Sequence, residues 1–173
     1  MANNRLFVLA GVLSILVLSW YGWGWISSSS KPSPQQLADT ALKSPNPQEK
    51  ERAAVRLAQM EYTAVPEMCR VLQESDVPAV KAAMIQGLAV DRDFNSMDTL
   101  LNAMNDPILL VRVRAAGAVQ RMLQIEVPGY RPEAPPEERL KAIKIYRAEW
   151  EKMRVSPALK NFREKLNQSR QGL

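Results

Sequence analysis

The side chains that could do chemistry in this chain are few, because its 173 residues include no histidine and one cysteine. Without histidine there is no imidazole general base, no Ser-His-Asp or Cys-His pair, and no imidazole ligand for a metal or haem. Cys69 alone forms no internal disulfide and no cysteine zinc site. The seven glycines form neither GxGxxG nor GxxxxGK[ST], so a phosphate-binding loop is missing. We therefore expect a protein that is not an enzyme and that carries no cofactor or metal.

The remaining reactive groups have plainer interpretations. Cys69 stands between Met68 and Val71 in an apolar helical pattern, which favours a packed core thiol over a nucleophile. Two pairs of neighbouring acids could do acid–base work or bind calcium, but both fall at expected helix ends or turns, where capping explains them. These pairs are Asp91/Asp93 and Glu137/Glu138.

An uncharged run from Leu6 to Ile26 precedes the rest of the chain. As a helix it would rise roughly 31 Å, enough to cross a hydrocarbon core. Its end is rich in aromatic residues, which favour the membrane interface and fit a peptidase site poorly. These residues are Trp20, Tyr21, Trp23 and Trp25. The run predicts a membrane anchor over 1–26 and a Ser/Pro linker over 27–34; a cleaved signal and a buried soluble helix are the alternatives.

The charge before the run sets the expected localisation. Arg5 and the α-amine favour a cytoplasmic N-terminus, with the domain on the periplasmic or exoplasmic side of a single-pass membrane protein.

Residues 35–125 read as pairs of helices that recur with a period of about 31 residues. The segments EKERAAVRL, VKAAMIQGL and VRVRAAGAV start at Glu49, Val80 and Val111, with equal spacing. Each carries a basic residue, then small or apolar residues that form one helical stripe. A two-helix unit of this length must stack on its neighbours to bury that stripe, which predicts an all-α solenoid. An antiparallel bundle with evenly spaced loops is the alternative.

The stretch LLNAMNDPILLVRVRAAGAVQRM resembles a HEAT repeat, of the short bacterial kind called lyase-type HEAT-like repeats. The resemblance covers about 36–124 and implies an armadillo-like superhelix. In that family the turn aspartate and the second-helix arginine commonly bond across neighbouring turns. The resemblance places these roles on Asp106 and Arg112, and on Asp76 and Lys81 one repeat earlier. The first unit departs from the pattern, as is typical of a capping repeat with a more polar outer face.

The C-terminal part changes character. A proline-rich connector is expected over 126–136. Helices are expected over 137–173, a stretch that contains ten Lys/Arg and five acidic residues. An apolar stripe is expected to seal the end of the solenoid; its members are Leu140, Ile143, Tyr146, Trp150 and Met153. The basic residues are expected to form a solvated face, with weak contact to anionic lipid left open and no nucleic acid bound. The segment is similar to those that follow HEAT repeats in proteins of planctomycete-like bacteria.

Together these features predict a non-catalytic, membrane-tethered scaffold that binds a protein partner, or an accessory subunit of a membrane-associated complex. Membrane contact is expected through residues 6–26. The residues expected to contact the partner are Lys81, Arg112, Arg114, Tyr130 and Arg131. Two alternatives remain: a lyase-like or cofactor-handling factor, and an electrostatic membrane-surface binder acting through the basic C-terminal helices.

Overall fold

Helices account for all the regular structure in the computed structural model, which describes residues 31–90, 94–126 and 129–171. They are α2 (Pro34–Lys43), α3 (Pro47–Ala58), the 3-10 turn η1 (Glu61–Ala64), α4 (Val65–Glu74), α5 (Pro78–Leu88), α6 (Met97–Ala103), α7 (Leu109–Leu123), α8 (Pro136–Arg154) and α9 (Pro157–Gln171). Over these ranges there is no strand, so the predicted all-α class is confirmed.

Prolines and short polar side chains set where the helices begin. A proline stands in the first turn of several helices, where its missing N–H leaves no bond unmade and its fixed φ suits the helix. These prolines are Pro34, Pro47, Pro78 and Pro136. The hydroxyl of Ser33 accepts a hydrogen bond from the Gln36 N–H, and the Asn46 side chain accepts one from the Gln48 N–H. Both contacts satisfy donors that a helix leaves free at its start.

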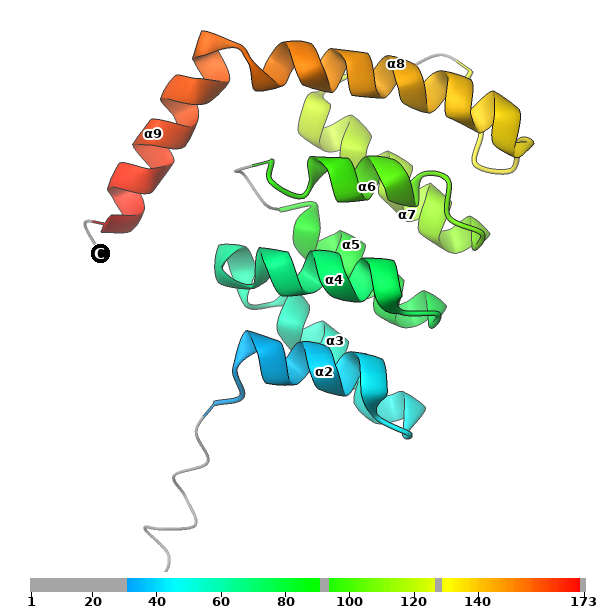
Figure 1. Ribbon diagram of the computed structural model, residues 1–173, viewed down its shortest axis with the longest axis vertical. Coiled ribbons are helices and arrows are strands. Elements are labelled where there is room, and N and C mark those ends of the chain that lie inside the picture. Colours follow the sequence, from blue (N-terminus) through cyan, green and yellow to red (C-terminus); the bar gives the residue numbers. More distant parts are fainter. Residues whose placement is uncertain (1–30, 91–93, 127–128, 172–173) are drawn as a thin grey trace, which may run out of the picture. The chain divides into compact units, whose positions relative to one another are not determined.

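Two layers of helices stack from α2 to α7 (Figure 1). In one layer α2 lies beside α4 and α4 beside α6; in the other, α3 lies beside α5 and α5 beside α7. We call these the first layer and the second layer. The long helix α8 packs on α6 and so extends the first layer, whereas α9 turns away at Ser156 and Pro157.

The core lies between the layers. In the second layer, the predicted apolar stripe is buried at every matched position: Ala53, Ala54 and Leu57 in α3, Met84, Ile85 and Leu88 in α5, and Ala115, Ala116 and Val119 in α7. Gly87 lets α5 approach its neighbours closely, because a Cβ there would lie 2.9 Å from the Ala58 Cα and 2.7 Å from the Met68 Sδ. Small side chains at the interface therefore set the spacing of the helices.

The stripe on α8 differs by one position from the prediction. Leu140 is exposed, and Arg139 is buried in its place beside Ile143, Tyr146 and Trp150. A guanidinium can occupy this position because backbone and side-chain oxygens accept its hydrogen bonds, as described below. Tyr146 and Trp150 are buried where α8 packs on α6, and the Tyr146 hydroxyl accepts a hydrogen bond from the Gln120 side chain of α7.

The predicted membrane localisation needs correction. No helix in the described ranges is long and apolar enough to cross a membrane, which contradicts the single-pass prediction as far as the structure extends. The predicted anchor and its four aromatic residues, Trp20, Tyr21, Trp23 and Trp25, lie outside the described residues.

Candidate protein-binding surface

The outward side of the second layer presents one continuous surface from three adjacent helices. Its residues occur at matching positions of α3, α5 and α7, 31 residues apart, because each helix buries the same stripe and exposes the same opposite side. We call this surface the second-layer face. Its members are Gln48, Glu51, Arg52, Val55 and Arg56 of α3, Ala79, Ala82, Ala83 and Gln86 of α5, and Leu110, Val113, Arg114 and Gly117 of α7.

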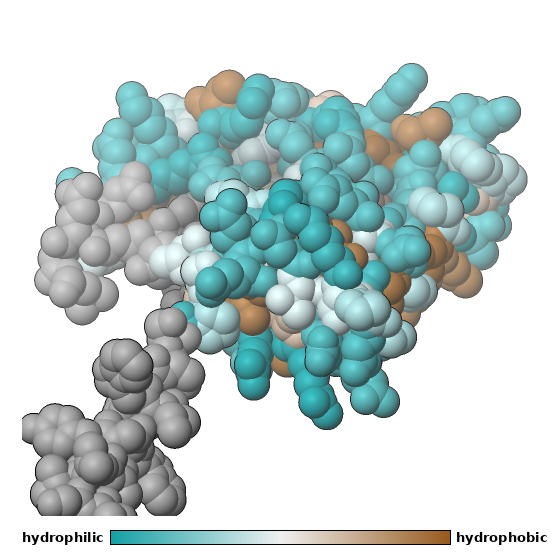
Figure 2. Space-filling view, turned by 60° about the horizontal axis from the view of Figure 1, so that its bottom comes forward, coloured by the Kyte–Doolittle hydropathy of each residue, from teal (hydrophilic) through white to brown (hydrophobic). Residues whose placement is uncertain are grey.

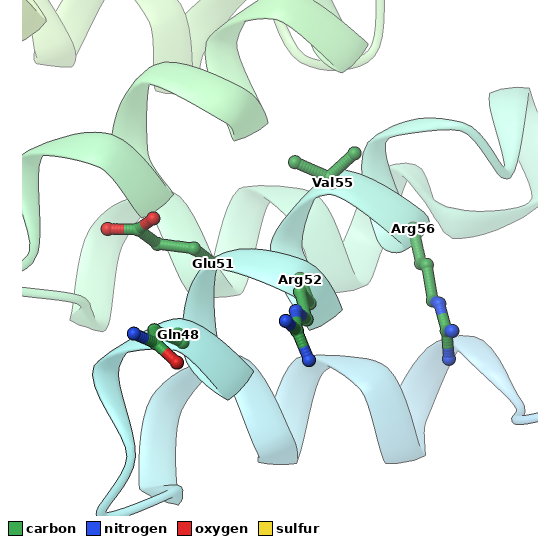
Figure 3. A pocket seen from close by; sticks show the side chains of 5 residues that line it. All are labelled: Gln48, Glu51, Arg52, Val55 and Arg56. Carbon is green, nitrogen blue, oxygen red and sulfur yellow. The ribbon is translucent and has the colours of Figure 1, made fainter.

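The α3 part of this face is polar. Its side chains line a shallow depression of about 420 Å³ (Figure 3), in which Arg52 and Arg56 extend in the same direction and Val55 points away from them. Hydrophilic side chains also cover most of the α2–α3 end of the molecule, and apolar residues show there only as small separate patches (Figure 2). The more polar outer face expected of the first unit is consistent with this composition.

The α7 part is apolar. Leu110 and Val113 are 43% and 48% exposed, and Leu109, which borders the face, is 48% exposed, although most large apolar side chains of the described residues are buried. Arg114 lies next to them and is exposed. Between the α3 and α7 parts, α5 contributes mainly alanines. The face thus combines an apolar end, a centre of small side chains and a charged end.

Lys81 is buried instead of facing a partner. Its ammonium lies 2.5 Å from the Asp106 carboxylate, and only 9% of each side chain is exposed. Asp106 also accepts a hydrogen bond from the Ile108 N–H at 2.8 Å, which fixes the turn between α6 and α7. The pair joins the second helix of one unit to the turn of the next. Of the bonds that the resemblance implies, this one is present.

Arg112 is also engaged within the chain. Its Nη1 donates to the backbone oxygens of Asp106 and Pro107, and its Nε donates to the backbone oxygen of Pro132 at 2.5 Å. The guanidinium therefore links the α6–α7 turn to the proline-rich connector. Its five donors in a rigid fork suit this role.

Of the two connector residues predicted to contact a partner, Tyr130 packs within the chain and Arg131 is exposed. The Tyr130 hydroxyl donates to the Met104 backbone oxygen at 2.6 Å, and its ring meets Tyr146 edge-on at 6.3 Å. Burial raises the pKa of Tyr130 to about 12. Arg131 is exposed and pairs with Glu138 at 3.0 Å. Of the five residues predicted to contact a partner, only Arg114 lies on the second-layer face.

Arg139, which was not predicted to be buried, also joins the α6–α7 turn to the connector. Arg139 donates to the Asn105 side chain at 3.0 Å and to the Ala134 backbone oxygen at 2.5 Å. The predicted stripe of α8 began at Leu140 and therefore excluded Arg139. No signal in the sequence pointed to a buried arginine at this position.

Asp76 does not have the turn role predicted for it. Its side chain is exposed, and the hydroxyl of Ser75 accepts the bond from the Val77 N–H at 3.2 Å. Ser75 stands 31 residues before Asp106 and makes the matching contact; one unit earlier, Ser44 accepts from the Asn46 N–H. The residue that matches Asp106 in this turn is therefore Ser75, one position before the predicted Asp76.

The exposed edge of the first layer carries an ion pair. Asp39 of α2 lies 3.1 Å from Arg70 of α4 and 3.4 Å from Lys43. The hydrogen bond from Arg70 and, to a smaller extent, the one from Lys43 hold the pKa of the Asp39 carboxyl below its ordinary value. Because both partners are well exposed, the pair adds little to stability.

Cys69 is partly buried and packs against the core. In the ranges that the structure covers, no three cysteines or acids come close enough to hold a metal ion. Comparison with protein-family models, with curated proteins and with solved structures found no match to this chain.

Proposed function

We propose that this chain is a non-catalytic scaffold, a short solenoid of HEAT-like helix pairs that binds a protein partner on its second-layer face. The carrying observation is the exposed cluster of Leu109, Leu110 and Val113 on α7, next to Arg114, which pairs with no acid among the described residues. Apolar side chains gathered on one face, rather than scattered, are typical of interaction sites.

Contacts that recur from one helix pair to the next support the proposal of a solenoid. Ser44, Ser75 and Asp106 make the same turn contact at equal spacing, and the Lys81–Asp106 pair joins neighbouring units. Repeat proteins of this kind bury one side of each helix pair against the next and leave the other side free along the whole stack. The second-layer face is that free side.

Charge indicates the partner. The face carries Arg52, Arg56 and Arg114 against the single acid Glu51, and none of the three arginines pairs with an acid among the described residues. A partner helix with apolar residues on one side and acids at its border would match this face. Such helices bind grooves and faces through anchors spaced three and four residues apart.

The test compares proteins captured by the full chain and by two double variants. Leu110→Asp/Val113→Asp alters the apolar end of the face. Ile145→Asp/Val155→Asp alters two side chains of similar chemistry and at least equal exposure on α8 and at its end. The proposal expects a partner that binds in near-equal amounts to the unmodified chain and the control variant, and at least tenfold less to the first variant. Equal recovery by all three chains contradicts it, provided that melting temperatures show them folded.

A further inference from the structure

A second concave site lies at the other end of the helices, where α9 meets the ends of α5, α7 and α8. It is an open depression of about 710 Å³. Small-molecule sites in proteins typically have volumes of roughly 300–1,000 Å³. This pocket shares no residue with the second-layer face as defined above.

The lining is apolar and adaptable. Met122 and Met153 contribute flexible thioethers to the wall. Phe94 and Phe162 contribute rings, and Leu159 lines the pocket from α9. Leu159 is the one buried side chain among those described in α9. Methionine fits ligands of irregular shape because its side chain is unbranched and polarizable. An alkyl chain is the ligand type that this lining favours.

A charged side chain, Arg121, lies at the edge of this apolar site. Arg121 is the single charged residue among the described residues that line the pocket. Its guanidinium runs back along α7 over Gly117, where a Cβ would come 3.4 Å from Nη1. An exposed arginine beside an apolar pocket suits a ligand with one anionic head, because guanidinium binds carboxylate with two parallel hydrogen bonds.

The backbone around the pocket is strained. Within the described residues, Phe94 (φ 59°) and Gln124 (φ 54°) are the two non-glycine residues with positive φ, and both line this pocket. Gln124 is the C-cap of α7, where a left-handed residue commonly ends a helix, so the strain lies at Phe94, a bulky residue that rarely adopts this conformation. Phe94 stacks on Trp150 with ring centroids 6.0 Å apart, so the pocket wall reaches an intrinsic fluorophore.

We propose that this pocket binds a linear alkyl carboxylate, with the chain against Met122, Met153 and Phe162 and the head at Arg121. The pocket shares no lining residue with the second-layer face, although the Arg121 guanidinium lies over Gly117 of that face.

Trp150 provides the readout. The chain has three other tryptophans, and Trp20→Phe/Trp23→Phe/Trp25→Phe leaves Trp150 as its only indole. Dodecanoate, dodecanol and dodecylammonium are titrated into this otherwise full-length chain below their critical micelle concentrations. We expect saturable, micromolar binding of dodecanoate with a shift in Trp150 emission, weaker binding of dodecanol, and the weakest binding of dodecylammonium.

Variants then separate the head from the chain. Arg121→Gln is expected to weaken dodecanoate about tenfold and to leave dodecanol unchanged. Arg114→Gln, on the same helix but outside the pocket, should change neither. Ala158→Trp fills the pocket and should abolish both, whereas Ala79→Trp on the second-layer face should abolish neither. Because each of these two variants adds an indole, their binding is measured by isothermal titration calorimetry instead of Trp150 emission. The proposal is overturned if dodecanoate fails to bind saturably, if Ala158→Trp leaves its affinity unchanged in a folded chain, or if dodecylammonium binds as tightly as dodecanoate.

Discussion

Replacing Lys81 by methionine tests whether the buried ion pair holds neighbouring helix pairs together. The substitution keeps the length and apolar stem of the side chain and removes its charge. Asp106 would keep its hydrogen bond from the Ile108 N–H but would lose the ammonium at 2.5 Å, with only 9% of its side chain open to water. An acid left buried and unpaired is the main source of the expected loss.

The size of the loss follows from burial. Removing one partner of a buried pair typically lowers the free energy of unfolding by about 3–5 kcal/mol, and the remaining hydrogen bond to Asp106 favours the lower end. About 3 kcal/mol corresponds to a drop in melting temperature of about 6–12 °C for a chain of this size. The double variant Lys81→Met/Asp106→Asn keeps the turn contact and has no unpaired charge, so it should be more stable than the single variant.

Urea unfolding followed by circular dichroism at 222 nm measures these differences. The matched control is Arg70→Met, which breaks the exposed pair with Asp39 and should lower the free energy of unfolding by less than about 1 kcal/mol. If Lys81→Met costs no more than Arg70→Met, the buried pair does not stabilise the stack and the reasoning fails. A double variant less stable than the single variant would refute the account of the unpaired acid.

Further predictions concern the packing and the titrating groups. Burial raises the pKa of Tyr130 from 10.0 to about 12, so the contribution of its protonated hydroxyl to stability is full below pH 10 and is lost as the pH rises toward 12. Tyr130→Phe should remove this pH dependence in unfolding experiments from pH 9 to 12. At pH 7 the substitution should lower the free energy of unfolding by about 1 kcal/mol. Gly87→Ala should destabilise the fold by about 1–3 kcal/mol, because the new Cβ would lie within 3 Å of the Ala58 backbone. Gly117→Ala should be neutral or stabilise the fold by up to about 1 kcal/mol, because only the flexible Arg121 guanidinium is near. Thermal melts distinguish the two variants. Arg70→Met should raise the pKa of Asp39 toward 3.8 in an NMR titration, without reaching it because Lys43 remains.

The periodic part of the fold was readable from the sequence, because helical stripes and proline starts are local signals. The nine matched positions in α3, α5 and α7 are buried as their spacing predicts. The stripe of α8 was placed wrongly at Leu140 because a hydrophobicity pattern does not anticipate a buried arginine. The oxygens that accept from Arg139 belong to Asn105 and Ala134, and only the three-dimensional fold brings them there.

The candidate site was harder to predict for a related reason. Lys81 and Arg112 are charged and occur on helices that line the stack, so they look like surface residues in a sequence. Their partners are a carboxylate and three backbone oxygens in turns, which no side-chain pattern reveals. The face that is exposed instead carries alanines, valine and leucine, which a sequence alone would assign to the core.

The link between the α6–α7 turn and the connector determines where this chain can be shortened. Arg112, Tyr130 and Arg139 bond groups on both sides of it, and Trp150 and Tyr146 cover the core beyond it. A truncation after Glu126 would leave the Arg112 guanidinium without the Pro132 oxygen and would open the apolar surface under α8 to water. Helix α8 is therefore part of the smallest cooperative folding unit, and a shortened chain that ends before Trp150 should aggregate or unfold.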